Sequence, residues 1–198
     1  MTAGRNRSFD KDKTLEKAML LFWKNGYPGT SLNDLTNIMD INKSSLYAAF
    51  GNKEKLFNQA IEFYLNKYGV VHSAELFKAG LNLKARIRNY LLSISKILTN
   101  PTLPKGCLIC HATSEIAGSC LPENSATYIT DINQQTLSTL TAFFEKEQLL
   151  GNIIQGNSPR TIANYLLTLQ FGLAISARNG CKMEELEAII DFFVSQFN

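Results

Sequence analysis

Apolar side chains recur along this chain with the spacing of α-helices, and this spacing limits the fold more than any other feature. Between about residues 10 and 25 they repeat at i, i+3, i+4 and i+7, as Leu15, Ala18, Met19 and Phe22. Residues with this spacing share one face of a helix. No run of alternating, β-branched residues bounded by turns competes with the helical pattern. We therefore expect an all-α protein.

A short second helix is predicted after Gly26 and the connector Tyr27-Pro28-Gly29, because Gly ends helices and Pro-Gly marks tight turns. Ser31 and Asp34 have the spacing of a capping box at the start of this helix. The helix is about two turns long. Its expected buried stripe is Leu32, Leu35, Ile38 and Met39.

A third short helix is predicted from about residue 43 to Phe50, after the break at Asp40-Ile41-Asn42. Its inward-facing residues are expected to be Leu46, Ala49 and Phe50. Gly51 ends it, and Asn52 can cap a fourth helix at about 53–68. Two short helices joined by a tight turn and braced by another helix form a helix-turn-helix pattern, here spanning about residues 31–50.

Longer helical patterns fill the rest of the chain. Pro and Gly separate them, and they cover residues 83–99, 106–118, 124–150, 158–178 and 183–197. We expect about nine helices in all. The change from short to long helices divides the chain into a three-helix domain at 1–52 and a helical bundle at 53–198.

The net positive charge of the chain lies at its N-terminal end. Residues 1–55 carry 9 Lys or Arg against 6 Asp or Glu, whereas the remaining residues carry 11 against 11. A basic end beside a neutral body is typical of a segment that contacts phosphate. An ordinary solvated face is the alternative interpretation.

The outer face of the third helix has the residues that a DNA-reading helix needs. Such a helix is held by buried anchors and presents small or polar side chains to the major groove. The outer residues here are Lys43, Ser44, Ser45, Tyr47 and Ala48. From the residues alone, a plain helical hairpin with a packed Tyr47 and solvated lysines remains the alternative.

Donors at the rim of this helix pair are candidates for phosphate contacts. Thr30 and Ser31 lie at a helix start, and Tyr47 and Lys53 follow at suitable spacing. Arg5 and Arg7 can form an N-terminal arm along the DNA backbone or in the minor groove.

Residues of about 14–65 resemble the N-terminal domain of TetR/AcrR-type regulators. The matching positions are Ala18, Leu21-Phe22, Gly26-Tyr27, Thr30-Ser31-Leu32, Asp34-Leu35, Ile41, Lys43-Ser44-Ser45-Leu46-Tyr47, Phe50, Lys53-Glu54 and Leu56. The resemblance implies a three-helix DNA-binding domain, a linking fourth helix, and a larger domain for ligand binding and dimerisation. It therefore implies a homodimeric repressor that a small-molecule inducer releases from a palindromic operator.

The resemblance also assigns roles to residues of the predicted three-helix domain at 1–52, which we call the reading head. Phosphate contacts fall on Thr30, Tyr47 and Lys53. Base reading falls on Lys43, Ser44 and Ser45. Many relatives have Gly at position 44 or 45 and His at position 49, where this chain has Ser44, Ser45 and Ala49. The departure leaves the operator sequence undetermined.

The two C-terminal helices, at about 158–178 and 183–197, are apolar around much of their circumference. Surplus apolar surface on a terminal helix pair favours a partner. Small residues for close approach are Gly172, Ala174, Ser176 and Ala177, and residues expected to supply buried area are Leu173, Ile189, Phe192, Phe193 and Phe197. The resemblance places these helices in a four-helix dimer interface. Completion of a monomeric core is the alternative.

Residues 124–141 form a polar segment with the single charge Asp131. The segment either lines a ligand cavity or lies under other helices with its hydroxyls bonded to the backbone. The candidates for a cavity lining are Gln134, Gln135, Ser138 and Thr139.

Cys107, Cys110 and His111 form a C-x-x-C-H pattern. At helical spacing the three side chains project from one side, so a metal site is one interpretation, although a closed zinc site needs a fourth ligand. Simple packing and a reactive Cys107 thiol at a helix start are the others. The pattern also matches c-type haem attachment, but that chemistry belongs to exported proteins and no export signal is present. We predict neither a cofactor nor a bound metal.

Reduced thiols and the absence of an export signal favour the cytoplasm. No run of about 18 apolar residues predicts a membrane span. A helical enzyme is a remote alternative, because the sequence has no Ser/His/Asp constellation and only His72 and His111 as bases near neutral pH. We therefore predict a protein that is not an enzyme.

Overall fold

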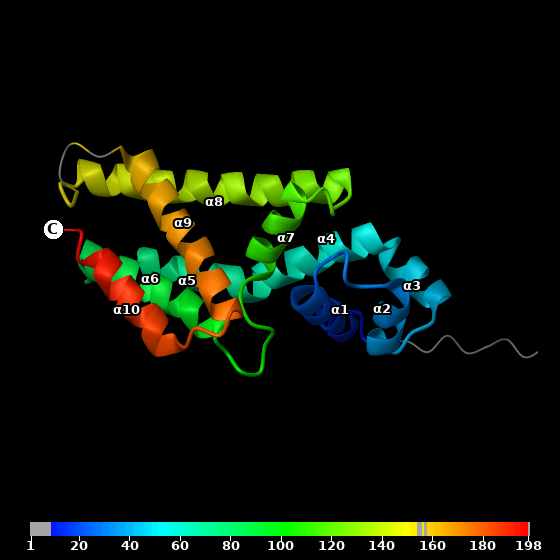
Figure 1. Cartoon of the computed structure of the whole chain (residues 1–198). Helices are drawn as coiled ribbons and strands as arrows, with labels where there is room; N and C mark the ends of the chain where they lie inside the picture. Colours follow the sequence, from blue (N-terminus) through cyan, green and yellow to red (C-terminus); the bar gives the residue numbers. More distant parts are fainter. Residues whose placement is uncertain (1–8, 154–155, 157, 198) are drawn as a thin grey trace, which may run out of the picture.

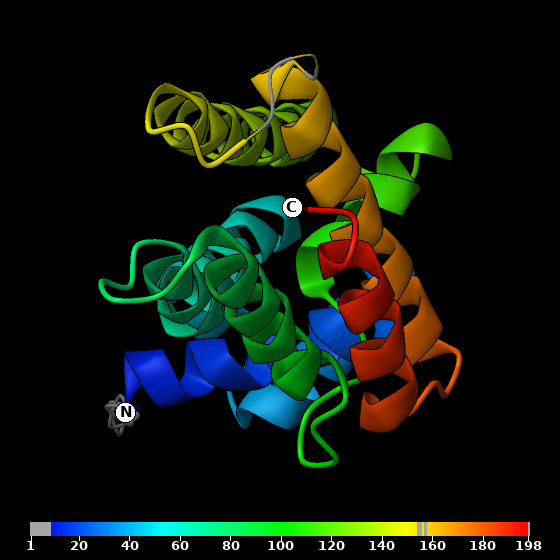
Figure 2. The same cartoon turned by 90° about the vertical axis from the view of Figure 1, so that its left-hand side faces the viewer.

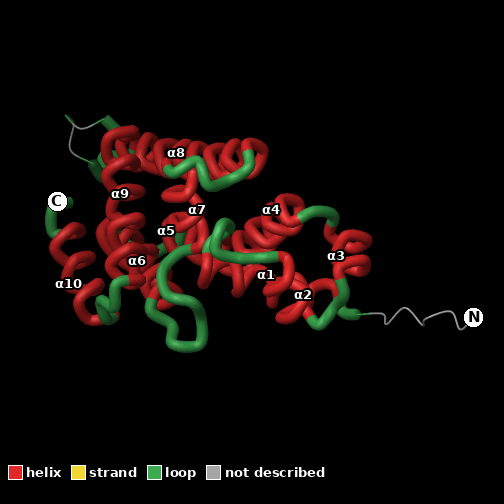
Figure 3. Tube along the Cα trace, turned by 45° about the vertical axis from the view of Figure 1, so that its right-hand side comes forward, coloured by secondary structure: helices red, strands yellow, loops and turns green. Residues whose placement is uncertain are grey.

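The computed structural model describes residues 9–153, 156 and 158–197. Within these residues every regular element is a helix, which confirms the all-α prediction (Figure 3). The elements are α1 (Lys11–Asn25), α2 (Leu32–Met39), α3 (Lys43–Phe50), α4 (Lys53–Tyr64), the π-helical η1 (Leu65–Gly69), α5 (Val70–Leu76), α6 (Leu83–Leu98), α7 (Leu108–Ala117), α8 (Glu123–Leu149), α9 (Pro159–Arg178) and α10 (Met183–Val194). Because α4, η1 and α5 follow one another without a break, the described chain forms nine rods, as expected.

Side-chain caps begin the first four helices, and the sequence predicts those at Ser31 and Asn52. The Ser31 hydroxyl accepts from the Asp34 N–H at 3.1 Å, and Asp34 accepts from the Ser31 N–H at 2.9 Å, so the capping box is confirmed. Asn42 and Asn52 accept from the N–H groups three residues later, at 2.7 and 2.8 Å. These bonds satisfy donors that have no partner within the helix.

Two details of the helix prediction are wrong. Ile38 is 46% exposed on α2, whereas Leu35 and Met39 of the same predicted stripe are buried. The fourth helix does not end near residue 68 but continues through η1 to Leu76. A π-helical turn shifts the helical register, which a search for a regular helical period does not detect.

The short helices α1–α3 lie at one end of the molecule, and α6, α9 and α10 lie at the other (Figure 1). In both Figure 1 and Figure 2, α8 lies along one side, and α9 descends from its end toward α10. One buried cluster joins α1–α4 to α7, and a second joins α6, α8, α9 and α10. The predicted division after residue 52 cuts the first cluster, because Leu56, Phe57 and Ile61 of α4 pack in it.

Trp23, the one tryptophan of the sequence, joins α1 to three segments that lie far from it in the chain. Its side chain is fully buried, and its Nε1–H donates to the Gly106 carbonyl at 3.1 Å. Its ring meets those of Tyr64 and Tyr68 at centroid distances of 4.9 and 5.6 Å. The indole therefore fixes α1 against α4, η1 and the segment before α7.

A buried ion pair fixes α6 against α8. Arg86 donates to both carboxylate oxygens of Glu147, which is 2% exposed, and also to the Leu76 carbonyl at 3.0 Å. Asn152 adds a hydrogen bond to Glu147 at 2.8 Å. Burial alone would raise the pKa of Glu147, but the hydrogen bonds from Arg86 and Asn152 outweigh it and leave that pKa below its ordinary value.

We predict that Glu147→Gln destabilises the protein by about 3 kcal/mol, because it leaves the Arg86 charge buried without its counter-ion. Glu187→Gln is the matched control, since Glu187 pairs with Arg88 at a partly exposed site, and it should cost less than about 1 kcal/mol. Urea unfolding measures both. Since the pKa of Glu147 is lowered on folding, its contribution to stability is present above the ordinary carboxyl pKa and is lost as the pH falls through the lowered value. Equal losses in the two variants would contradict this role.

Candidate DNA interface and ligand cavity

The outer face of α3 is open to solvent at the end of the molecule away from α10 (Figure 1). Leu46 and Phe50 hold the helix down and are 0% and 2% exposed. Tyr47 is 47% exposed on the opposite side. Of the other predicted contact residues, the exposed ones are Lys43, Ser44 and Ala48, and Ser45 is half-buried. The face thus has the anchors and the small polar surface of a groove-reading helix.

The predicted phosphate-contacting residues do not all reach the surface. Thr30 is fully buried, and its hydroxyl donates to the Gly26 carbonyl at 2.7 Å. The Thr30 hydroxyl therefore holds the turn after α1, and the phosphate contact of Thr30 stays a prediction. Ser31 is exposed, although its hydroxyl donates to Asp34 at 2.6 Å. The predicted arm residues Arg5 and Arg7 lie outside the described residues.

Lys53 begins α4 beside the reading head. Its Nζ lies 4.1 Å from the ring centroid of Tyr27, a cation–π contact. Burial lowers the pKa of Lys53, and the nearby Glu115 carboxylate opposes that shift. The contact holds the base of α4 against the turn that leads to α2.

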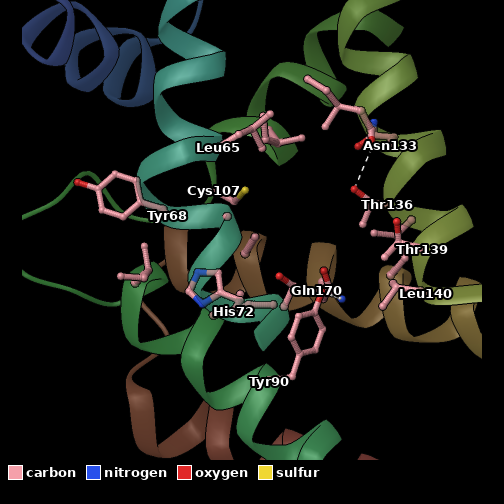
Figure 4. Close-up of a pocket in the computed structure, with 18 of the residues that line it drawn as sticks. Leu65, Tyr68, His72, Tyr90, Cys107, Asn133, Thr136, Thr139, Leu140 and Gln170 are labelled. Carbon is pink, nitrogen blue, oxygen red and sulfur yellow. Dashed lines mark hydrogen bonds between the residues drawn. The ribbon is translucent and has the colours of Figure 1, made fainter. Parts of the chain in front are cut away.

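A cavity of about 400 Å³ lies between the α4–α5 rod, α6, α8, α9 and the start of α7 (Figure 4). Three predicted ligand residues line it, namely Cys107, Gln135 and Thr139. Of the other candidates, Cys110, His111, Gln134 and Ser138 are not among its lining residues. The polar segment at 124–141 therefore contributes one wall of a cavity through some of its residues.

Cys107, Cys110 and His111 do not converge, so the shared face expected for them is wrong. Cys107 precedes α7, and its Sγ accepts from the Tyr64 hydroxyl at 3.4 Å. Cys110 is buried against the Phe171 carbonyl, and burial raises the pKa of its thiol to about 11. His111 points to Glu115. Among the described residues, no group of three or more His, Cys, Asp or Glu is placed to hold a metal ion.

The far end of α7 contacts the reading head through Glu115. Both carboxylate oxygens lie 3.2 Å from the Tyr27 N–H, and His111 Nε2 lies 3.6 Å from one of them. Gly26 allows this approach, because a Cβ there would lie 2.0 Å from Glu115 Oε1. Burial raises the pKa of Glu115, and the hydrogen bond from Tyr27 opposes that shift. The sequence carries no signal for this contact, because it joins residues that lie 88 positions apart in the chain.

Arg178, at the end of α9, adds a second contact to the same joint. It donates to the Trp23 and Lys24 carbonyls at 3.3 and 3.0 Å, which are acceptors at the end of α1. Cationic side chains are favourable at a helix C-terminus. Helix α7 and the end of α9 together attach the body of the protein to α1.

Helices α9 and α10 carry exposed apolar side chains. The exposed fractions are 54% for Tyr165, 46% for Ile175, 41% for Ile189 and 70% for Phe192. Leu173 and Phe193, by contrast, are buried within the chain itself, so the prediction that they supply area for a partner is wrong. Within the described part of the chain, no helix has the length and apolarity to cross a membrane.

Comparison with known proteins gives relatives for both parts of the molecule. A family model described as "Bacterial regulatory proteins, tetR family" matches residues 15–60, which include α2 and α3. The HTH-type transcriptional repressor ComR of Escherichia coli (strain K12) is 32% identical over 189 residues, covering 94% of this chain and 88% of the relative.

Solved structures resemble the whole fold. A cysteine mutant of the TetR family transcriptional regulator CifR, complexed with 26-bp double-strand operator DNA, is 27% identical. It covers 98% of this chain and 100% of its own, with a TM-score of 0.85. A TetR family regulator from Agrobacterium tumefaciens has a TM-score of 0.83 at 20% identity, over 95% and 97% of the two chains, and supports the fold alone. The match over nearly the full length of ComR, together with the family model on the helix-turn-helix, shows that the chain belongs to the TetR family of bacterial transcriptional regulators.

Proposed function

We propose that the protein is a homodimeric transcriptional repressor that binds operator DNA through α3 and is released by a small molecule in the cavity. The observation that carries the proposal is the exposed polar face of α3, held in place by Leu46 and Phe50. The relative CifR, of the same fold, was solved with operator DNA. Residues 1–52 form the reading head, and residues 53–198 bind the ligand and the second subunit. We propose further that the protein acts in the cytoplasm, where its operator DNA lies, and that its activity is regulation rather than catalysis.

The exposed apolar face of α9 and α10 is the proposed dimer interface. Phe192 and Tyr165 are the largest of its exposed side chains. The space beside Gly172 is open, since a Cβ there would meet no atom within 4 Å. A two-fold dimer presents two copies of α3, and their separation must match half-sites one helical turn apart. Binding therefore depends on how each head is held by its own body.

The cavity can influence the head through two elements. Tyr64 and Leu65 belong to the rod that begins as α4 under the head, and Cys107 and Ile109 belong to the start of α7. The other end of α7 carries Glu115, which bonds the turn before α2. A ligand that favours a different position of these elements changes the spacing of the heads and lowers the affinity for operator.

We predict that Tyr47→Ala or Lys43→Ala weakens binding to the DNA upstream of the protein's own gene about tenfold, because each removes a polar contact with DNA. Thermal stability should change little, since both side chains are exposed. Fluorescence anisotropy at two salt concentrations measures the affinity. Lys96→Ala, an exposed lysine of α6, is the matched control and should bind as the unmodified protein does. Loss of stability in Tyr47→Ala, or equal affinity in all variants, would contradict the assignment.

A thiol-based signal is a second candidate, favoured by the position of Cys107. This half-buried, reduced thiol lines the cavity and accepts a hydrogen bond from Tyr64. Addition to an activated alkene forms an Sγ–C bond, and the thiol proton ends on the neighbouring carbon, so no oxidant is needed. The adduct would occupy the same space as a non-covalent inducer.

We predict that N-ethylmaleimide, an uncharged activated alkene, releases the protein from operator DNA by modifying Cys107. The experiment uses a background in which Cys120 and Cys181 are replaced by Ser, because the first is exposed and the second half-buried. Intact mass should show one adduct, and affinity for operator should fall at least about tenfold. Cys107→Ser in the same background is the control and should keep its affinity. An adduct without release, or no adduct, would remove the thiol candidate and leave the non-covalent inducer.

A further inference from the structure

The chemistry of the cavity wall limits what the cavity can hold. Most of its lining is aliphatic or aromatic, and its polar side chains come from Tyr64, Tyr68, His72, Ser73, Tyr90, Cys107, Asn133, Gln135, Thr136, Thr139 and Gln170. Among the lining residues that the structure describes there is no Asp, Glu, Lys or Arg. The volume of about 400 Å³ lies in the range of small-molecule pockets.

A charged ligand would find no counter-ion in this lining. Transfer of an ion from water into such a site is unfavourable unless an opposite charge compensates for the lost hydration. The one lining group that titrates near neutral pH is His72, and burial lowers its pKa. Its Nδ1 is hydrogen-bonded to Ser93 Oγ at 2.8 Å, which holds the ring against α6. The wall is therefore uncharged at neutral pH.

Tyr90 supplies a hydrogen-bond donor at the floor of the cavity. Its side chain is 7% exposed, and its hydroxyl oxygen accepts from Gln170 Nε2 at 3.0 Å. Among the described contacts, the proton of this hydroxyl has no acceptor. Burial raises the pKa of Tyr90 to about 12, so the O–H is kept at neutral pH. Figure 4 shows the hydroxyl and Gln170 together, directed toward the interior of the cavity.

The hydroxyls and the Asn133 amide of α8 already donate to partners within the protein. The Thr136 and Thr139 hydroxyls donate to the carbonyls of Ile132 and Gln135, at 2.8 and 2.9 Å. Asn133 donates to Thr113 at 2.9 Å. The two hydroxyls that satisfy their own helix offer only acceptor lone pairs to a ligand. Gln135, the other polar side chain of this wall, is exposed, so water can satisfy its amide. The buried donor is therefore the Tyr90 hydroxyl.

We propose that the cavity binds an uncharged, mainly apolar molecule whose acceptor oxygen, as in a ketone or an ester, receives a hydrogen bond from Tyr90. An acceptor oxygen satisfies the buried donor that has no acceptor among the described contacts, and the apolar remainder fills the aliphatic and aromatic walls. This inference deepens the proposed function, because it names the chemical class of the inducer, but binding to the cavity is measured without DNA.

Three fluorescent probes test the class of ligand on the full-length protein. Prodan is an uncharged naphthalene ketone, phenylnaphthylamine is uncharged and lacks an acceptor oxygen, and anilinonaphthalenesulfonate is its anionic counterpart. We expect saturable binding of prodan, and binding of phenylnaphthylamine at least about tenfold tighter than that of the sulfonate. No saturable prodan binding, or equal affinity for the two matched probes, would overturn the proposal. Thr136→Phe, which fills the cavity, should abolish prodan binding, and binding that survives it would also overturn the proposal.

Tyr90→Phe tests the hydrogen bond. We expect it to weaken prodan binding about fivefold to tenfold and to leave phenylnaphthylamine binding unchanged. Tyr68→Phe is the matched control, because Tyr68 lines the same cavity with its hydroxyl directed away from Tyr90 (Figure 4). An equal effect of the two variants on prodan would overturn the role of Tyr90. Circular dichroism checks that each variant is folded.

Failure of this inference is distinguishable from failure of the proposed function. A protein that binds operator DNA selectively but takes up no prodan contradicts the ligand class and leaves the repressor. A protein that binds prodan through Tyr90 but no operator contradicts the repressor and leaves the cavity chemistry.

Discussion

The bond from the Tyr27 N–H to the Glu115 carboxylate is the contact on which the arrangement of head and body depends. It requires Gly26, since any side chain there would occupy the position of the carboxylate. Trp23 reinforces the joint by donating to Gly106, and Arg178 does so by donating to the end of α1. Hydrogen bonds between partly buried groups are sensitive to small displacements. The joint can therefore hold the head in one position and release it when α7 moves.

Helix α7, a single short helix, connects the Tyr27–Glu115 contact to the cavity. Cys107 and Ile109 at its start line the cavity, and Glu115 near its end reaches the head. The α4–α5 rod forms a second connection, since Tyr64 lines the cavity and packs on Trp23. Two packed elements that share the same cavity wall are expected to move together, because cores have discrete packed arrangements. The proposed function therefore predicts that a ligand in the uncharged cavity changes the position of the head.

The sequence predicts those features of the fold that depend on residues close together in the chain, such as helix caps and helix ends. The caps at Asn42 and Asn52 and the stop at Gly51 depend on residues a few positions away, and their helices lie where the sequence places them. Thr30 is expected to be a donor at a helix start, but its hydroxyl bonds the Gly26 carbonyl and the turn after α1 buries it. The surroundings of Cys107 depend instead on a distant segment, because Tyr64 of α4, 43 positions away, donates to its Sγ. The donor role of Tyr90 arises only when α9 brings Gln170 to it, 80 positions along the chain.

The most direct test of the coupling is the affinity for prodan of the free dimer and of the same dimer saturated with operator DNA. Linkage requires that a ligand which lowers operator affinity binds the operator complex more weakly by the same factor. The account predicts at least about fivefold weaker binding in the complex. It also predicts that Glu115→Ala, which removes the bond to Tyr27, reduces this ratio toward unity. Equal prodan affinity with and without operator would contradict the account, because the cavity and the reading heads would then be energetically independent.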